Sequence, residues 1–511
     1  MKLFGSKTGL KILFVATESA PFAKVGGLSS VMHALPRALN RLGHDARVII
    51  PRYLFINDDQ WKLKVIHEHL EVPTNNETGP ANLICNIKQY TPKESTDPVT
   101  TYFIENQEYY EQRANVYGYA DDPIRWALLS RGTLEFVRIH SEWTPDIIVI
   151  SDWQTGYLAN YLRTEYKDDP KLSKIPTVFC IHNLFYQGMF DHRFVQEMDY
   201  DDGHSPIPGF ENPRLMKLNA MRRGIMYADG ISTVSQTYAK EILTKEYGET
   251  LDELLRERRA VLTGILNGID YKQWDPEHDP YIVHPYNASK VETRAKNKQV
   301  LQERFGLPVA KNTFLVGIVA RLVKQKGFDL MYNMMETLLQ ELPMQLVIVG
   351  EGDADIMGFF HDLETRYPDK VATHLKFDPI LPHIVYAGVD AVLIPSKFEP
   401  SGLTQMEAMR MGAVPIVRKT GGLADTVEDY NPNKQTGTGF VFEKYNSSSL
   451  MIAFIRAFET YRDKKDWQYL QRQDMLQDFS WDSSAKKYVD FLQRAIEFRN
   501  RARGVVKTVV L

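Results

Sequence analysis

The sequence predicts an α/β protein made of two doubly wound domains, each built on a mostly parallel sheet. Short runs rich in Val, Ile and Leu alternate with helical patterns along the chain. Such runs are typical of strands that are buried on both faces of a parallel sheet. The alternation occurs as two series, and a polar segment with several prolines, 271–298, separates them. At 511 residues the chain is also too long for one hydrophobic core.

The first series starts close to the N-terminus and predicts the first domain. Its opening strand is followed by a helical pattern that ends at about Leu42, and a hairpin-rich region, Lys62–Asn106, interrupts the alternation. The predicted strands of this series are Lys11–Thr17, Arg47–Pro51, Asp146–Ser151, Thr177–His182 and Gly230–Ser235.

The second series predicts a second domain after a hinge near Leu266–Asp270. Helical spacing in Ser480–Arg503 indicates a terminal helix. We therefore expect a first domain at 1–265, completed by a helix at about 481–511, and a second domain at 266–480. Two such domains that face each other would bind a ligand in the deep cleft between their strand ends. The strands predicted for the second domain are Phe314–Ala320, Gln345–Gly350, Val371–Phe377, Ala391–Pro395 and Val414–Val417.

Composition narrows the possible partners. The chain has 61 Lys+Arg against 65 Asp+Glu, so its net charge of −4 favours neither nucleic acid nor an anionic membrane. Two distant cysteines, Cys85 and Cys180, predict free thiols rather than a disulfide framework. No apolar run reaches membrane-spanning length, and no metal-ligand spacing occurs. We expect a cytoplasmic protein that uses neither a metal nor a cofactor.

The stretch 398–405 carries the strongest functional signal. Glu399 lies on a turn after an apolar strand, and Gly402 precedes a helical pattern from Gln405 to Met411. A helix N-terminus offers unpaired N–H groups to an anion, and the carboxylate beside it can bind hydroxyls. This pairing suits a nucleotide sugar.

Two basic glycine-containing stretches could contact its phosphates. The first is Lys24-Val25-Gly26-Gly27-Leu28, where glycines permit a close backbone approach; a plain glycine turn before a helix is the alternative. The second runs from Arg321 to Gly327 and contains Lys326; a solvated basic loop is the alternative. Dinucleotide binding is disfavoured, because the closest fingerprint has Asp355 in place of its third glycine.

Polar pairs at other strand ends are candidates for sugar contacts. His182-Asn183 ends a predicted strand, and Asp152-Trp153 follows another. Capping residues are the competing interpretation for both pairs, and Asn267-Gly268 is by itself a turn signal. Glu407 lies two helical turns beyond Glu399, where an exposed helix glutamate is equally compatible with the pattern.

Taken in order, these stretches resemble the bacterial glycogen synthases and plant starch synthases, retaining glucosyltransferases with two Rossmann-like domains (GT-B). The terminal FSWDSSAKKYVDFL resembles the family's last helix, which crosses back onto the first domain. The resemblance spans nearly the whole chain. It rests on KVGGL, SDWQTGYL, CIHNLFYQGMF, ISTVSQTYAKEI, ILNGIDYKQWDP, VARLVKQKGFDL, FEPSGLTQ and RKTGGLADTV.

The resemblance implies a role for each matching residue. Glu399 would hold the donor glucose hydroxyls, and Arg321 and Lys326 would neutralise the departing diphosphate. The catalytic residues would be these three and His182. Substrate would also be bound by Lys24, Gly26, Gly27, Asp152, Asn183, Asn267, Phe377, Ser401, Gly402, Leu403, Thr404 and Glu407, with Phe377 against the base.

The chain departs from the family pattern at three places. Ser29-Ser30 follows the glycines where the family commonly has Gly/Ala-Asp, and Ser151 replaces the usual His. Glu407 is unusual for the family and resembles the second Glu of the E-x7-E pattern of a related retaining family, where it holds ribose hydroxyls. These departures put the preference for the donor base in doubt.

The implied activity is transfer of glucose, with retention, from ADP-glucose or UDP-glucose to the nonreducing end of a glycogen-like α-1,4-glucan. Three alternatives remain open. A related glycosyltransferase could use another acceptor, such as a disaccharide phosphate. A weakly active homologue could bind glucan as a regulator. An oxidoreductase on the same frame is least favoured, because the dinucleotide fingerprint is missing.

Overall fold

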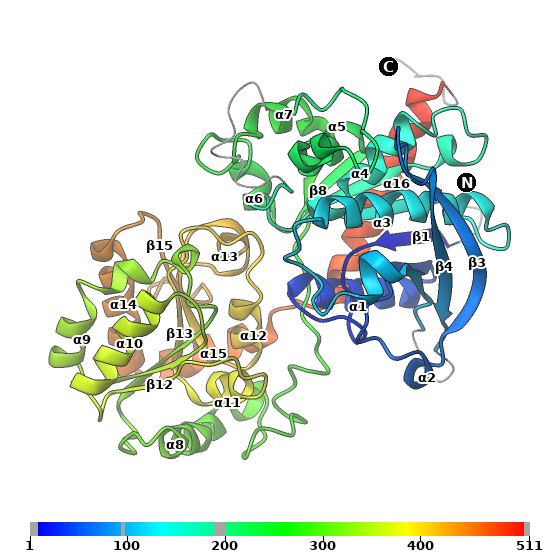
Figure 1. Ribbon diagram of the computed structural model, residues 1–511. Coiled ribbons are helices and arrows are strands. Elements are labelled where there is room, and N and C mark those ends of the chain that lie inside the picture. The colour runs from blue at the N-terminus through cyan, green and yellow to red at the C-terminus, as the bar shows by residue number, and fades with distance from the viewer. Residues whose placement is uncertain (1–8, 93–97, 189–200, 505–511) are drawn as a thin grey trace, which may run out of the picture. The chain divides into compact units, whose positions relative to one another are not determined.

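The computed structural model describes residues 9–92, 98–188 and 201–504 and divides the chain into two compact α/β units (Figure 1). The first unit comprises residues 1–234, 239–265 and 481–511, and the second comprises 235–238 and 266–480. Met189 and Phe190, which end one of the family-like stretches, lie outside the described residues. Each unit is layered around its own sheet.

The first unit contains a nine-stranded sheet in the order β3-β4-β5-β2-β1-β6-β7-β8-β9. The strands from β5 to β9 pair in parallel, and β3 and β4 add an antiparallel hairpin at one edge. All five strands predicted for this domain are present. The bounds are β1 (Lys11–Val15), β2 (Asp45–Pro51), β3 (Lys64–Pro73), β4 (Asn82–Tyr90), β5 (Thr101–Glu105), β6 (Ile147–Ser151), β7 (Thr177–Ile181), β8 (Gly230–Thr233) and β9 (Leu262–Gly264).

The predicted terminal helix, α16 (Trp481–Ala502), packs in this first unit against α1 (Gly27–Arg41) and β8. Its buried face carries Trp481, Tyr488 and Phe491, and Arg41 of α1 forms an ion pair with Asp482 at 2.6 Å. The other α-helices before residue 265 are α2 (Asp58–Trp61), α3 (Asp122–Ile139), α4 (Asp152–Arg163), α5 (Ala220–Tyr227), α6 (Gln236–Glu241) and α7 (Asp252–Glu257).

The second unit contains a six-stranded, fully parallel sheet in the order β12-β11-β10-β13-β14-β15. Its strands are β10 (Phe314–Val319), β11 (Met344–Val349), β12 (Val371–His374), β13 (Ala391–Ile394), β14 (Val414–Arg418) and β15 (Phe440–Phe442). Its helices are α8 (Arg294–Arg304), α9 (Met335–Glu341), α10 (Ala354–Arg366), α11 (Leu381–Gly388), α12 (Thr404–Arg410), α13 (Gly421–Thr426), α14 (Ser447–Arg462) and α15 (Lys464–Leu476).

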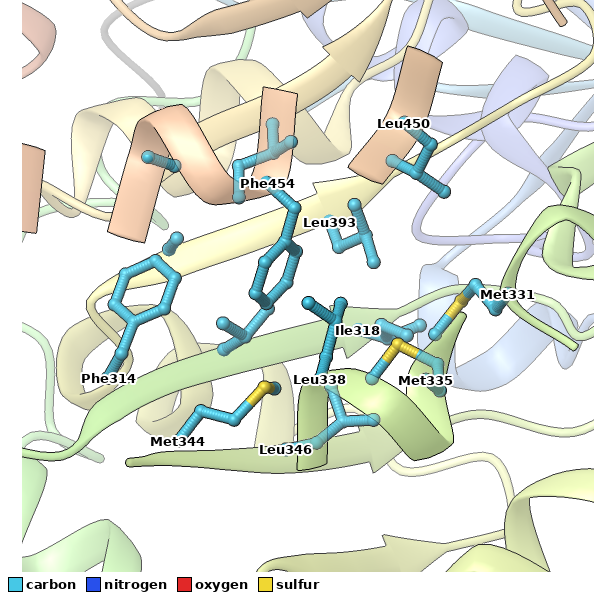
Figure 2. Packing of buried hydrophobic residues seen from close by; sticks show 14 of the residues in the cluster. Phe314, Ile318, Met331, Met335, Leu338, Met344, Leu346, Leu393, Leu450 and Phe454 are labelled. Atoms are coloured by element: carbon cyan, nitrogen blue, oxygen red, sulfur yellow. The ribbon is translucent and has the colours of Figure 1, made fainter. Parts of the chain in front are cut away.

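Alternate residues of β10 pack into two hydrophobic clusters. Phe314 and Ile318 join Met335, Leu338 and Phe454 in one cluster, which Figure 2 shows. Leu315 belongs to the other cluster, which includes residues of α11 and α12. A strand buried on both faces explains why β10 reads as a continuous apolar run in the sequence.

Most predicted strand ends lie within two residues of the observed ones, and one differs by three. The strand expected at Val371–Phe377 ends at His374, so Phe377 lies on a loop. The chain turns here because the Asp378 side chain accepts hydrogen bonds from the N–H groups of Ile380 and Leu381 at the start of α11, at 2.8 and 2.9 Å. Such local bonds replace strand pairing.

Both cysteines are buried free thiols, as predicted. None of the described helices has the length and apolar character needed to cross a membrane.

Candidate active site

The second unit joins two of its sequence-predicted residues directly. Lys326 Nζ lies 2.6 Å from Glu399 Oε2, and both side chains are largely buried. Ser396 Oγ donates to the same carboxylate oxygen at 2.8 Å. Lys326 follows β10 and Glu399 follows β13, and these strands pair in parallel. Their carboxyl ends therefore meet at one sheet edge, where α/β proteins bind ligands.

The loops that carry these two residues are tied together through their backbones. Lys397 N donates to Gln325 O at 2.8 Å, and Gln325 Nε2 donates to Phe398 O at 3.2 Å. Gly327 has φ +73°, and a Cβ added there would lie 2.1 Å from Pro395 O. A larger residue would therefore push the loops apart, which explains the glycine that follows Lys326.

The stretch Thr420-Gly421-Gly422 packs against the backbone of the loop that carries Glu399. Gly422 N donates to Glu399 O at 3.0 Å. A Cβ on Gly421 would lie 1.9 Å from Glu399 O, and one on Gly422 would lie 1.7 Å from Ser401 O. These glycines thus let the start of α13 touch the backbone of the 399–401 turn.

Helix α12 begins at Thr404, directly after Ser401, Gly402 and Leu403, and no side chain caps its first turn. Gly402 has φ +62°, which favours glycine, and Gln405 Nε2 donates to its carbonyl at 2.7 Å. Within the described part of the chain, Ser401 Oγ and Gln405 Oε1 are buried without a hydrogen-bond partner. Buried polar atoms normally have partners, so this turn is suited to a polar ligand.

Two further predicted residues of the second unit lie on its surface. Arg321, the residue two after the end of β10, is exposed. Phe377 is 74% exposed, and its N–H donates to Glu351 Oε2 at 3.2 Å. An aromatic ring this exposed is available to stack on a planar group of a ligand.

Glu407 is not the exposed helix glutamate that the sequence pattern also allowed. Its side chain is half-buried, and burial raises the pKa of its carboxyl group to about 7, while a hydrogen bond with Trp274 opposes the rise. Glu407 is therefore not an ordinary exposed helix glutamate.

Asn267, also of the second unit, is buried, and its Oδ1 has no partner among the described residues.

In the first unit, the glycine loop is organised by Glu18, a residue that the sequence analysis did not single out. The buried Glu18 carboxylate accepts from Val25 N at 2.7 Å and from Gly26 N at 2.9 Å. Helix α1 starts at Gly27 without a side-chain cap, and a Cβ on Gly27 would meet no atom within 4 Å. The N–H of Gly26 is thus already used, whereas Gly27 faces open space beside the exposed Lys24.

Asp152 orients the pair His182-Asn183. Its Oδ1 accepts from His182 N at 2.7 Å and from Asn183 N at 3.3 Å. Asp152 has φ +53°, a strained conformation for a residue other than glycine, and burial raises the pKa of its carboxyl group. Within the described residues, His182 Nε2 is buried and has no hydrogen-bond partner. Asp152 therefore positions the backbone while His182 keeps a ring nitrogen available.

The structure thus groups the predicted residues into clusters that each belong to one unit. Lys326, Glu399 and the 401–404 turn share one sheet edge of the second unit. Asp152, His182 and Asn183 share an edge of the first unit, because β6 and β7 are parallel neighbours. Among the described residues, no group of three or more His, Cys, Asp or Glu side chains could hold a metal ion.

Comparison with known proteins identifies the family. Residues 11–257 match the model "Starch synthase catalytic domain", and residues 300–474 match "Glycosyl transferases group 1". The glycogen synthase of Thermotoga petrophila is 41% identical over 495 residues, which cover 95% of this chain and 99% of that protein. The chain belongs to the glycogen and starch synthase family. The glycogen synthase of Clostridium perfringens is also 41% identical, over 489 residues, with 96% and 99% covered.

Solved structures agree with this assignment. The catalytic domain of starch synthase IV from Arabidopsis thaliana, bound to ADP and acarbose, matches with a TM-score of 0.81 and 33% identity, covering 96% of this chain and all of that one. Sucrose-phosphate synthase from Thermosynechococcus elongatus matches with a TM-score of 0.55 and 17% identity, covering 95% and 99%, and shows the shared fold alone. The chain is therefore a GT-B-type glycosyltransferase of the glycogen synthase family, as the sequence predicted.

Proposed function

We propose that this member of the glycogen synthase family transfers glucose from ADP-glucose to the nonreducing end of an α-1,4-glucan, with retention of configuration. The observation that carries the proposal is the Lys326–Glu399 pair beside the uncapped start of α12, in a chain that resembles a starch synthase bound to ADP and acarbose. The ADP in that relative favours ADP-glucose over UDP-glucose. The second unit would bind this donor, and the first would bind the glucan.

In this proposal the second unit binds both ends of the donor. The ammonium of Lys326 and the guanidinium of Arg321 stabilise the diphosphate as negative charge develops on it. The N–H groups at the start of α12 donate to sugar and phosphate oxygens, and Glu399 accepts from glucose hydroxyls. Phe377 provides a face for the adenine ring, because it is an exposed aromatic residue that follows β12 at the same sheet edge.

The environment of Glu399 bears on the route by which configuration would be retained. Its Oε2 is bound by Lys326 and Ser396, so the carboxylate is held as an acceptor rather than presented as a nucleophile. We favour attack of the acceptor O4 on C1 from the face that the diphosphate leaves. The C1–O bond to phosphate breaks with its electron pair going to the phosphate, and the departing phosphate oxygen takes the proton of the acceptor hydroxyl.

The first unit carries its own cluster of proposed substrate contacts. In this proposal His182 Nε2, a buried atom without a partner among the described residues, bonds a glucose hydroxyl, with Asn183 beside it, and Asp152 fixes the backbone of both. Gly27 and Lys24 are suited to approach phosphate oxygens, since no atom of the described residues lies within 4 Å of where a Cβ at position 27 would stand. Asn267 Oδ1 is a further buried acceptor without a partner among the described residues.

The test is nucleotide release from ADP-glucose and from UDP-glucose, each with and without glycogen. We expect release that depends on glycogen and is faster with ADP-glucose. The linkage is checked by digesting the elongated product with β-amylase, which cleaves α-1,4-linked ends. Faster use of UDP-glucose would refute the donor assignment, and release that is indifferent to glycogen would refute the acceptor.

A further inference from the structure

The second unit has a cavity of about 360 Å³ between the beginning of α8 and the beginning of α15. Lys298 lines it and lies between two strands: its Nζ contacts Thr313 O, just before β10, and Asp390 Oδ2 at 2.6 Å, just before β13. The cavity therefore lies at the amino ends of these parallel strands.

This position separates the cavity from the candidate active site. Arg321 and Glu399 follow the carboxyl ends of the same two strands, β10 and β13. Strand β10 has six residues, which span about 20 Å. A ligand in the cavity would therefore lie across the thickness of the domain from the Lys326–Glu399 pair.

The cavity wall has an excess of positive charge. Four cationic residues line it, against the carboxylates of Glu292 and Asp390. Lys298 is paired with Asp390, whereas the Arg294 guanidinium donates to the carbonyls of Tyr386, Val389 and Met411. The other two cations are Lys311 and Lys464, and neither forms an ion pair within the described part of the chain.

Lys464, one of these two cations, is an exposed residue at the cavity wall. Its Nζ lies 3.0 Å from the centroid of the Tyr461 ring. Partial burial lowers the pKa of its ammonium group to about 8. The charge of Asp390 opposes this shift, and the charge of Lys298 adds to it. A bound anion beside the Lys464 ammonium group would favour its charged form and so oppose the loss of hydration.

The wall also holds polar groups for the body of a ligand. Trp467 is buried, and its indole N–H finds no acceptor in the described residues. Gln468 and Gln471 follow on α15 and also line the cavity; Gln471 Nε2 donates to Gly412 O at 3.1 Å, so its Oε1 is the atom left for a ligand hydroxyl. A cavity of this size is within the range of about 300–1,000 Å³ for small-molecule sites, so it accommodates more than a bare ion.

We propose that this cavity is a second ligand site, which binds a small phosphate monoester with a polar body. The Lys311 and Lys464 ammonium groups hold the phosphate, and Trp467, Gln468 and Gln471 bond the hydroxyls of the attached group. The proposal is independent of the transfer reaction, because it rests on the opposite edge of the sheet.

Isothermal titration of the full chain with ribose 5-phosphate, glycerol 3-phosphate and inorganic phosphate tests it. We expect saturable binding of at least one ester, tighter than that of inorganic phosphate. Lys464→Glu should weaken ester binding about tenfold or more by charge reversal at short range. Lys465→Glu makes the same charge change on the same helix but outside the cavity wall, and should leave binding within about twofold.

Lys326→Ala separates this site from the candidate active site, because it removes the phosphate-binding ammonium there and should leave ester binding unchanged. Loss of binding in Lys326→Ala but not in Lys464→Glu would overturn the proposal. So would equal loss in Lys464→Glu and Lys465→Glu, or no saturable binding of any of the three probes. Lys311→Glu, an exposed position on a loop, repeats the test if Lys464→Glu is poorly folded.

Discussion

Lys326 and Glu399 form an ion pair in which the ammonium nitrogen lies 2.6 Å from a carboxylate oxygen. Ser396 donates a hydrogen bond to the same oxygen. In the proposed reaction one partner binds diphosphate and the other binds glucose hydroxyls. A diphosphate that draws Lys326 toward itself therefore changes the charge environment of Glu399 at the same time. The pair couples recognition of the phosphate to recognition of the sugar, although the two residues lie 73 positions apart.

Lys326→Ala should lower turnover by about 10²–10³-fold, because one preorganised group that stabilises developing charge contributes on this scale. The loss should appear in kcat more than in KM for ADP-glucose, since the charge on the diphosphate grows in the transition state. Nucleotide release in the presence of glycogen measures both constants.

Lys324→Ala is the matched control, because Lys324 is an exposed lysine on the same short 3-10 turn, Lys324–Lys326. It should retain activity within about twofold. A Lys326→Ala enzyme that elongates glycogen at a near-normal rate would show that this ammonium does not act on the diphosphate.

The sequence predicted the strands that position this site better than the side-chain contacts within it. The run Phe314–Ala320 matches β10 almost residue for residue, because a strand buried on both faces leaves a continuous apolar signal. The three-residue strands β9 and β15 were missed, since so short a segment carries no readable period. The hydrogen bonds of Glu18 depend on how the loop between β1 and α1 folds back on itself, and the Lys326–Glu399 pair joins two separate loops. Patterns in a single sequence do not record such contacts.

Gly27→Ala should weaken donor binding without loss of stability, whereas Gly422→Ala should lower stability. A methyl group at position 27 meets no atom within 4 Å, so the protein should fold normally and keep its melting temperature. Its KM for ADP-glucose should rise, about tenfold or more, if phosphate oxygens approach this backbone closely. At position 422 the methyl group would lie 1.7 Å from Ser401 O, so the turn must shift and the melting temperature should fall.

Thermal unfolding and ADP-glucose kinetics on both variants distinguish these outcomes. Gly27→Ala with unchanged kinetics would remove the glycine loop from the proposed donor site. Gly422→Ala with wild-type stability would contradict the close packing of the 420–422 stretch against the 399–401 turn.

Asp152→Asn and Asp152→Ala should also differ. Asparagine tolerates the φ of +53° and keeps an oxygen that can accept from His182 N and Asn183 N, so activity should be largely retained. Alanine loses both hydrogen bonds and is strained by about 1–2 kcal/mol in this conformation. We expect Asp152→Ala to lower the melting temperature and kcat together, with the asparagine variant as the control. Equal kinetic loss in both would mean that the charge of Asp152, rather than its positioning role, matters.

Glu407 should make stability fall as pH rises toward neutrality. Burial raises the pKa of its carboxyl group from 4.5 to about 7. Below pH 4.5 the group is protonated in both the folded and the unfolded chain, and it then has no effect on the pH dependence. Between these values the folded chain holds a proton that the unfolded chain has released, so stability decreases as pH increases. Above pH 7 the full penalty applies, at most ~3 kcal/mol.

Glu407→Gln removes the ionisable group while keeping its size. The difference in melting temperature between the variant and the parent isolates Glu407 from the other groups that titrate in this range. We expect the variant to gain stability relative to the parent on going from pH 5 to pH 8, because only the parent must then keep a buried charge beside Trp274. A difference that stays constant between these pH values would show that Glu407 is already ionised at pH 5 in the folded chain. In that case the hydrogen bond with Trp274, and not desolvation, would dominate its pKa.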